Sequence, residues 1–114
     1  MAPGDYSRES GALAMRELLG RAPDLDAVFA ANDLMALGVV ELLHDVGLRV
    51  PEDVAVVGFD DISAASSAEP ALTTMRQPFD RISEEMVRLL LDVIAGKHHA
   101  AITIPTELVV RGSA

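Results

Sequence analysis

The sequence of 114 residues contains no cysteine and no tryptophan. Without cysteine, disulfides and thiolate-ligated metal sites are excluded, and the composition fits a reducing cytoplasm. No apolar run approaches the roughly 18 residues that are needed to span a bilayer. The first ten residues, MAPGDYSRES, also lack the apolar core of a signal peptide. We therefore expect a cytoplasmic protein with no membrane partner.

Basic residues are scarce as well. The chain carries nine Lys and Arg against eighteen Asp and Glu, which gives a net charge of −9, and Lys97 is its only lysine. A nucleic-acid-binding surface needs clustered Lys and Arg to neutralise phosphates. These residues on their own are therefore not expected to bind DNA or RNA.

Aromatic residues make up only 4% of the chain, whereas hydrophobic residues make up 50%. This balance predicts a globular domain with an aliphatic core, and the length corresponds to one domain or part of one. Apolar periodicity and turn residues indicate where the helices and strands lie. We expect helices over about residues 7–20, 34–46 and 79–95, and extended segments at 27–31, 54–58, 72–77 and 102–110.

The alternation of helices and strands with short links is typical of an α/β fold with a doubly wound parallel sheet. The runs 27–31 and 54–58 show no alternation of polar and apolar residues, so we expect both strands to be buried on both faces. A sheet of this type normally has about five or six strands. This one is therefore expected to be truncated on its N-terminal side. Pro105 should divide the last extended run into two short edge pieces.

Two adjacent carboxylates, Asp60 and Asp61, follow the strand at 54–58. In parallel sheets, ligands bind just beyond the carboxyl ends of the strands. The pair suits general acid/base chemistry, a metal site or hydrogen bonding to a polar ligand, or else it caps the loop.

The histidines favour neither catalysis nor a metal site. His44 falls late in a helix, and Lys97 follows one, so neither is expected beside the two carboxylates. His98 and His99 are adjacent in a loop, where their side chains point apart, which favours a solvated loop over a metal site. The sequence also lacks a glycine-rich phosphate loop and a nucleophile elbow. We therefore expect no metal and no cofactor.

Asn32 and Asp33 follow the preceding strand in the same way. An Asp before a helix is usually its cap, and Asp33 is predicted to have this role. Asn32 offers both a donor and an acceptor, so it is the better ligand candidate. Tyr6 precedes the first helix, where its ring lies over a ligand or packs as a hydrophobic staple.

The helix at 34–46 carries more apolar surface than the two helices of a short chain are expected to cover. An uncovered apolar face of this kind usually marks a subunit contact. Its apolar residues are Leu34, Met35, Leu37, Val39, Val40, Leu42 and Leu43.

Five runs of the sequence together point to a known family. They are GDYSRESG, AVFAANDLMALG, LRVPEDVAVVGFDD, PALTTMRQP and TELVVRGS. In these runs, which keep the family's order and spacing and cover nearly the whole chain, the sequence resembles the C-terminal portion of the lactose-repressor (LacI/GalR) family of transcriptional regulators.

The resemblance implies a fold like that of the periplasmic sugar-binding proteins, in which two α/β subdomains enclose a small effector such as a sugar. In the family, the Asp of GFD and the Asn of AND hydrogen-bond the effector, which maps to Asp60 and Asn32. The aromatic residue after GD stacks on the ligand, which maps to Tyr6. The Gln of the TTxRQ run lines the cleft, which maps to Gln77.

The resemblance also implies a homodimer. In the family, the helix after AND and the small loop before PALTT form the contact between the two copies. These segments map to Leu34, Leu37, Glu41 and Ala68.

Several parts of the family's architecture have no counterpart in the sequence. They are the DNA-binding head, nearly all of the N-terminal subdomain, the first strands of the C-terminal subdomain and the arginine-bearing segment that grips the effector. Residues 1–114 thus correspond to a single partial effector-binding and dimerisation domain, with 1–75 and 100–114 as the core of the C-terminal subdomain. In the family, the helix at 78–96 packs on the missing subdomain. Here we expect it to fold back onto its own sheet or to swap between chains.

The expected function is effector sensing and dimerisation in a bacterial transcriptional regulator, without enzymatic activity and with DNA contacted only through the absent head. We expect little or no effector binding by these 114 residues alone. Two alternatives remain open. One is a stand-alone sugar-binding protein of the transport type, and the other is an enzyme or phospho-acceptor that uses Asp60 and Asp61.

Overall fold

The computed structural model describes residues 1–98 and 101–114. His99 and Ala100, and with them part of the predicted histidine loop and the first residue of the 100–114 segment, lie outside the described residues. The elements in chain order are α1 (Arg8–Arg21), β1 (Ala27–Phe29), α2 (Asp33–Asp45), β2 (Ala55–Asp60), α3 (Ser63–Ser67), β3 (Thr73–Arg76), α4 (Phe79–Ile94) and β4 (Glu107–Val109).

The four strands form one sheet in the order β1-β2-β3-β4. The first three are parallel, with Phe29 opposite Val57 and Val57 opposite Thr73. The last strand, β4, runs antiparallel at the edge beside β3. The predicted edge position after Pro105 is therefore confirmed, although the segment before this proline forms no strand.

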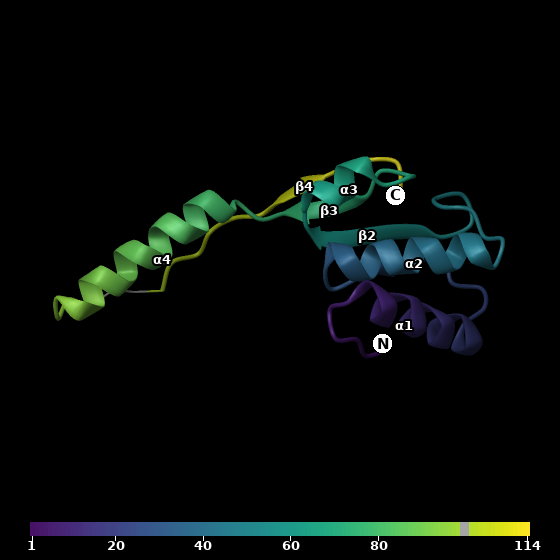
Figure 1. The fold of residues 1–114 in the computed structure, drawn as a ribbon, viewed down its shortest axis with the longest axis horizontal. Helices are drawn as coiled ribbons and strands as arrows, with labels where there is room; N and C mark the ends of the chain where they lie inside the picture. The colour runs from purple at the N-terminus through teal and green to yellow at the C-terminus, as the bar shows by residue number, and fades with distance from the viewer. Residues whose placement is uncertain (99–100) are drawn as a thin grey trace.

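The core lies between the sheet and the pair α1 and α2. Met15 from α1, Leu43 from α2, Val56 from β2, and Leu72, which directly precedes β3, are all fully buried. Figure 1 shows α2 lying along β2 with α1 beside it. The aliphatic core predicted from composition is thus observed.

The opposite face of the sheet is not covered by any helix of the described residues. Phe29 in β1 is 64% exposed, and Ala55, Val57 and Phe59 in β2 are only half-buried. The prediction that both strands are buried on both faces is therefore wrong. Apolar residues of these two strands also lie on the face of the sheet that α1 and α2 do not cover.

Helix α1 begins as predicted. Ser7 is the N-cap, and its hydroxyl oxygen accepts a hydrogen bond of 3.1 Å from the backbone N–H of Ser10. This bond satisfies one of the unpaired donors of the first turn.

Helix α1 packs unusually closely on α2, because a glycine of each helix lies at the contact. A Cβ on Gly11 would come within 2.2 Å of the Met35 carbonyl oxygen, and a Cβ on Gly38 within 1.9 Å of the Arg8 carbonyl oxygen. Together, α1 and the sheet bury nearly all of the apolar surface of α2. Leu34 at 41% is the exposed large hydrophobic residue of the helix, and its C-cap Val46 is 53% exposed, so the expectation that a broad apolar face of this helix stays uncovered is wrong.

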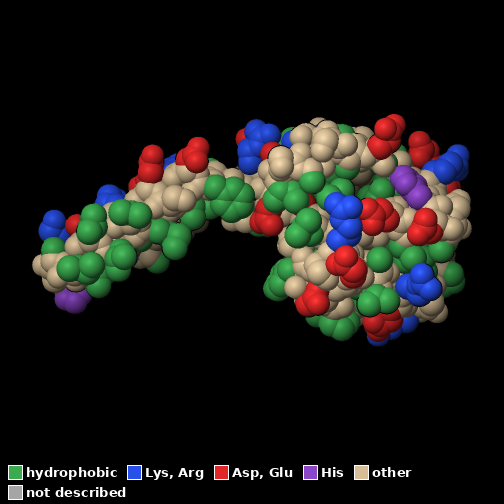
Figure 2. All heavy atoms as spheres, viewed as in Figure 1, with side chains coloured by type: hydrophobic (Ala, Val, Ile, Leu, Met, Phe, Trp, Pro, Cys, Tyr) green, Lys and Arg blue, Asp and Glu red, His purple; other side chains and the backbone are tan. Residues whose placement is uncertain are grey.

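Helix α4 extends away from the rest of the molecule (Figure 1), which gives the chain its length of 57 Å against 25 and 19 Å in the other directions. No residue of α4 is buried. Figure 2 shows hydrophobic side chains along much of the helix. The expectation that α4 folds back onto its own sheet is therefore wrong. Among the described residues, no helix has the length and apolar character required to cross a bilayer.

Candidate functional site

Three of the four predicted ligand residues follow neighbouring parallel strands. Asn32 comes after β1, Asp60 ends β2, and Gln77 comes directly after β3. Because these strands run in the same direction, their carboxyl ends lie at one edge of the sheet, where ligands of open α/β sheets bind. This edge is the candidate site.

Asp60 and Gln77 are in direct contact. The Gln77 side-chain Nε2 donates a hydrogen bond of 2.6 Å to Asp60 Oδ1, and both residues are half-buried. A backbone bond from the Gln77 N–H to the Asp60 carbonyl oxygen, at 3.4 Å, runs alongside. The second carboxylate oxygen of Asp60 can accept from a ligand donor, and so can the side-chain amide oxygen Oε1 of Gln77.

Asn32 and Tyr6 form a second pair. The Asn32 side chain donates from Nδ2 to the Tyr6 carbonyl oxygen at 3.0 Å, and its Oδ1 accepts from the Met35 N–H at 2.9 Å. Asn32, and not Asp33, is therefore the N-cap of α2, and the predicted cap role of Asp33 is wrong. One N–H of the Asn32 amide remains for a ligand. The Tyr6 ring is 65% exposed.

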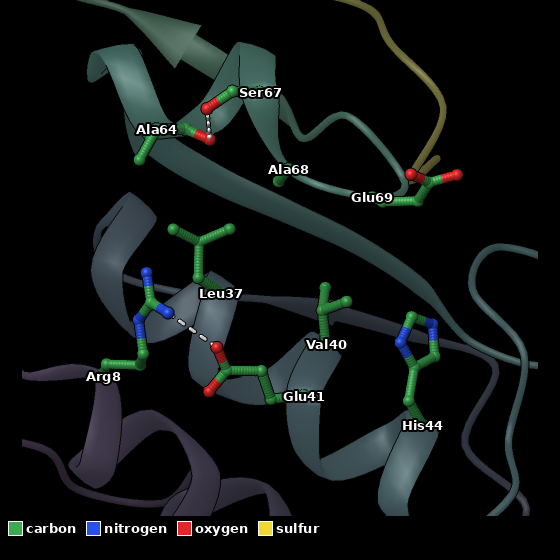
Figure 3. Close-up of a pocket in the computed structure, with 9 residues that line it drawn as sticks. All are labelled: Arg8, Leu37, Val40, Glu41, His44, Ala64, Ser67, Ala68 and Glu69. Carbon is green, nitrogen blue, oxygen red and sulfur yellow. Dashed lines mark hydrogen bonds and ion pairs between the residues drawn. The ribbon is translucent and has the colours of Figure 1, made fainter.

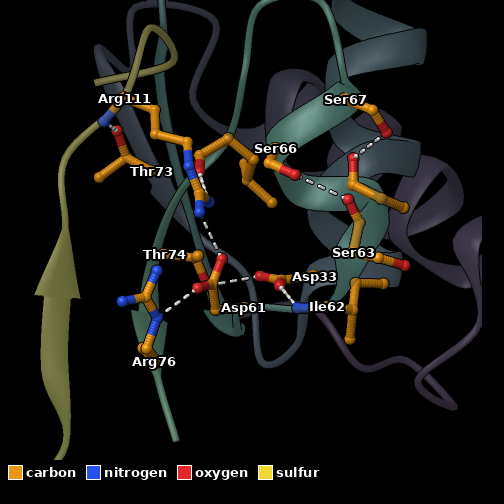
Figure 4. Close-up of polar contacts among 12 residues, drawn as sticks. Asp33, Asp61, Ile62, Ser63, Ser66, Ser67, Thr73, Thr74, Arg76 and Arg111 are labelled. Atoms are coloured by element: carbon orange, nitrogen blue, oxygen red, sulfur yellow. Dashed lines mark hydrogen bonds and ion pairs between the residues drawn. The ribbon is translucent and has the colours of Figure 1, made fainter.

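Asp33 has a structural role that its sequence position did not reveal. It is fully buried. Its Oδ2 accepts from the Ile62 N–H at 2.9 Å and its Oδ1 from the Thr74 hydroxyl at 2.5 Å (Figure 4). Asp33 thus ties the start of α2 to the loop after β2 and to β3. Ile62 and Thr74 follow Asp33 by 29 and 41 positions, so no local sequence pattern could have predicted these contacts.

The backbone at the site is strained. Tyr6 has φ +71°, Asp60 +116° and Asp61 +62°. Residues with a Cβ rarely adopt these values, and each such residue costs about 1–3 kcal/mol. Strain of this kind persists only where the surrounding contacts hold the chain in place.

Asp61 is held by two arginines. Arg76 Nε donates to its Oδ2 at 2.6 Å, and Arg111 Nη2 donates to its Oδ1 at 2.7 Å (Figure 4). Burial of the Asp61 side chain acts to raise its pKa, but the hydrogen bonds from Arg76 and Arg111 outweigh this and leave the pKa below its ordinary value. The ion pairs therefore stabilise the fold at neutral pH and are lost as the pH falls through the folded-state pKa. This arrangement agrees with a structural role for Asp61.

The predicted dimer residues also lie together, with one exception. Leu37, Glu41 and Ala68 line a hollow of about 250 Å³ between α2 and the α3 segment (Figure 3). Arg8 reaches into it from α1 and pairs with Glu41 at 2.6 Å. Leu34 does not line this hollow, although its side chain is partly exposed.

The structure does not assemble a metal-binding cluster from the described residues. No group of three or more His, Asp or Glu side chains among them is arranged to hold a metal ion. Lys97 pairs with Asp92 near the end of α4, far along the chain from Asp60.

The cap role of Asn32 leads to a first prediction. Replacement of Asn32 by Ala should lower the free energy of unfolding by about 1–2 kcal/mol, because the Met35 N–H loses its partner. Ser7→Ala, which removes the cap of α1, is the matched control and should cost about 1 kcal/mol. Urea denaturation measures both losses. An Asn32→Ala protein as stable as the wild type would contradict the assignment.

The similarity of the chain to known proteins agrees with the fold and the position of the candidate site. A sequence profile described as periplasmic binding protein-like domain matches residues 1–114. The chain belongs to that family. Its relatives within the family are transcriptional regulators of the LacI type.

Two curated relatives are regulators from different bacteria. The chain is 52% identical over 112 residues to the HTH-type transcriptional regulator CelR of Thermobifida fusca, covering 96% of this chain and 33% of CelR. It is 40% identical over 115 residues to the transcriptional repressor CytR of Escherichia coli K12, covering 99% of this chain and 34% of CytR. The chain thus spans about a third of the length of these relatives.

Solved structures give the same family. A CelR–cellobiose complex superposes with a TM-score of 0.91 at 51% identity, over 97% of this chain and 35% of that one. The lac repressor dimer bound to operator and an anti-inducer superposes with a TM-score of 0.89 at 35% identity, over 96% of this chain and 39% of that one. The predicted periplasmic-binding-protein-like α/β fold is therefore confirmed.

Proposed function

We propose that this chain forms one wall of an effector-binding cleft in a bacterial LacI-type transcriptional regulator. The observation that carries the proposal is the contact between Asp60 and Gln77 at the carboxyl edge of the sheet. Two polar side chains that fix each other's orientation offer a carboxylate oxygen and an amide oxygen to the hydroxyl groups of a ligand. The ligand we propose is a sugar, and the similarity to CelR, solved with cellobiose, supports this class.

Tyr6 and Asn32 complete this wall in the proposal. The exposed Tyr6 ring offers an apolar face to a sugar ring. Asn32 holds the Tyr6 backbone through its amide and keeps one N–H for the ligand. The opposing wall belongs to a second subdomain, against which the apolar stripe of α4 would pack. DNA would be contacted by a separate head in a regulator of this type.

A second copy of the chain would pack over the surface that contains Leu34, Leu37, Glu41 and Ala68. The hollow between α2 and α3 gives this surface a concave shape, and the lac repressor was solved as a dimer. Closure of the two subdomains around the effector would then alter the geometry of the dimer. Such a change is a shift of the population between two conformational states.

A chimera tests the proposed function. The corresponding third of Thermobifida fusca CelR is replaced by this chain, and cellobiose binding is measured by calorimetry. Asp60→Asn in the chimera should weaken cellobiose binding by about 10–100-fold, because a hydrogen bond to a charged group contributes roughly 1.5–3 kcal/mol. Wild-type affinity in the Asp60→Asn chimera would contradict the proposal.

Asp53→Asn is the matched control for this chimera. Like Asp60, Asp53 accepts hydrogen bonds from a neighbouring side chain, here two of 2.8 and 2.9 Å from the Arg49 guanidinium, but it precedes β2 and so lies at the opposite end of that strand. Cellobiose binding by the Asp53→Asn chimera should equal that of the unmodified chimera.

A further inference from the structure

We propose that Asp61 is a positioning residue, held between Arg76 and Arg111, whose contacts fix the strained turn that orients Asp60 toward the effector. The inference rests on the proposed effector role of Asp60 and adds residues that this role does not itself require. It starts from the backbone. Asp60 and Asp61 are consecutive residues at positive φ, so the chain leaves β2 through a turn that would relax if it were free.

The contacts of Asp61 restrain this turn from two sides. Its side chain is only 8% exposed, and each carboxylate oxygen accepts from a different arginine. Arg76 belongs to β3, next to β2, and its Cα lies opposite Asp60 in the register of the sheet. Arg111 follows β4 at the far edge of the sheet. Movement of Asp61 would therefore break ion pairs with two separate segments.

Arg111 is itself fixed, so it can act as an anchor. Its Nη1 donates to the Leu72 carbonyl oxygen at 2.9 Å, and its backbone N–H donates to the Thr73 hydroxyl at 2.9 Å. One guanidinium thus bridges the start of β3 and the Asp61 carboxylate. The side chain is only 17% exposed, which shields the bridge from solvent screening.

The consequence for the site is geometric. Asp60 is covalently joined to the restrained residue, and its Oδ1 meets Gln77 at 2.6 Å. Gln77 directly follows Arg76, so the residue that holds Asp61 also sets the start of the segment that carries Gln77. If the turn relaxes, the two side chains separate and the ligand-ready conformation becomes a smaller fraction of the population.

Nuclear magnetic resonance of the 114-residue chain tests the inference without any ligand. In the wild type, exchange of the Gln77 side-chain amide protons with solvent should be slow, because the Nε2 group donates a hydrogen bond to Asp60 Oδ1. Asp61→Asn removes the charge but keeps a residue that tolerates positive φ. This variant should lower the protection factor of the Gln77 side-chain amide by about tenfold if the ratio of ordered to relaxed turn falls about tenfold.

Asp53→Asn removes an arginine-paired carboxylate before β2 and should leave the Gln77 signals unchanged. If Asp61→Asn does not give the spectrum of a folded protein, Arg76→Gln replaces it, since this side chain is 48% exposed and its loss leaves the core intact. Arg76→Gln should reduce the protection in the same direction by a smaller factor. Unchanged Gln77 protection in the folded variant would overturn the inference.

The two proposals can fail separately. The absence of cellobiose binding by the CelR chimera would refute the proposed effector role and leave the Gln77 measurement as it stands. Normal Gln77 protection in Asp61→Asn, together with weakened cellobiose binding in Asp60→Asn, would refute only the positioning role.

Discussion

Replacement of Gly38 by Ala is expected to lower the free energy of unfolding by about 3 kcal/mol or more. A Cβ at this position would lie 1.9 Å from the carbonyl oxygen of Arg8, which belongs to the backbone of α1. A backbone atom cannot move aside as a flexible side chain does, so the two helices must separate and the core between them loses packing. Gly11→Ala, whose Cβ would lie 2.2 Å from the Met35 carbonyl oxygen, should act in the same way.

Gly20→Ala is the matched control for the two glycine variants. Gly20 lies in α1, but a Cβ there would meet nothing within 4 Å. Because Ala favours the helical conformation over Gly, this variant should gain up to about 1 kcal/mol. Thermal and urea denaturation of the three proteins give the comparison. Gly38→Ala and Gly20→Ala with equal stability would show that the helices are not in close contact.

Replacement of Asp33 by Ala should cost about 3 kcal/mol. The Ile62 N–H and the Thr74 hydroxyl both lose their acceptor. Each buried polar group left without a partner costs roughly 1–3 kcal/mol. The lost bonds join three separate segments, so we expect an earlier urea midpoint and weaker protection of the amides in α2 and β3 in hydrogen exchange.

The variant Asp33→Asn distinguishes the contribution of the hydrogen bonds to stability from that of the negative charge. The Asn oxygen can accept from the Ile62 N–H while its amide donates to the Thr74 hydroxyl oxygen, so both contacts have a neutral replacement. The loss should be clearly smaller than for Asp33→Ala. Equal losses for the two variants would contradict the view that unpaired hydrogen-bonding groups dominate the effect.

The sequence was most informative about local structure. The first helix, predicted over about residues 7–20, begins with Ser7 as its N-cap, and Gly96 ends the fourth helix with a positive φ of +77°. These features depend on residues a few positions apart, so one sequence contains the information. The α/β class followed from the order of helices and strands and did not need the contacts between them.

The errors concern relations across long stretches of chain. Asn32 and Asp33 are both good caps, and the choice between them is decided by Thr74 and Ile62, which give Asp33 a buried alternative. The close contact through Gly38 explains how a short chain covers α2, which counting apolar residues could not reveal. At the candidate site, Asp60 and Gln77 were predicted from the family pattern, but Arg76 and Arg111 lie far from Asp61 in the chain and meet it only in the folded protein.

The two chain connections of α4 have a mechanical consequence. The chain enters this helix from β3 through Gln77 and Pro78, and it returns to β4, the neighbour of β3. At the root of these connections, Arg76 of β3 and Glu107 of β4 approach within 3.9 Å. A force on the protruding helix therefore reaches two adjacent strands together and acts as a torque at the residues next to Asp60. Movement of α4 would therefore turn about its connections to β3 and β4, which lie beside the candidate site.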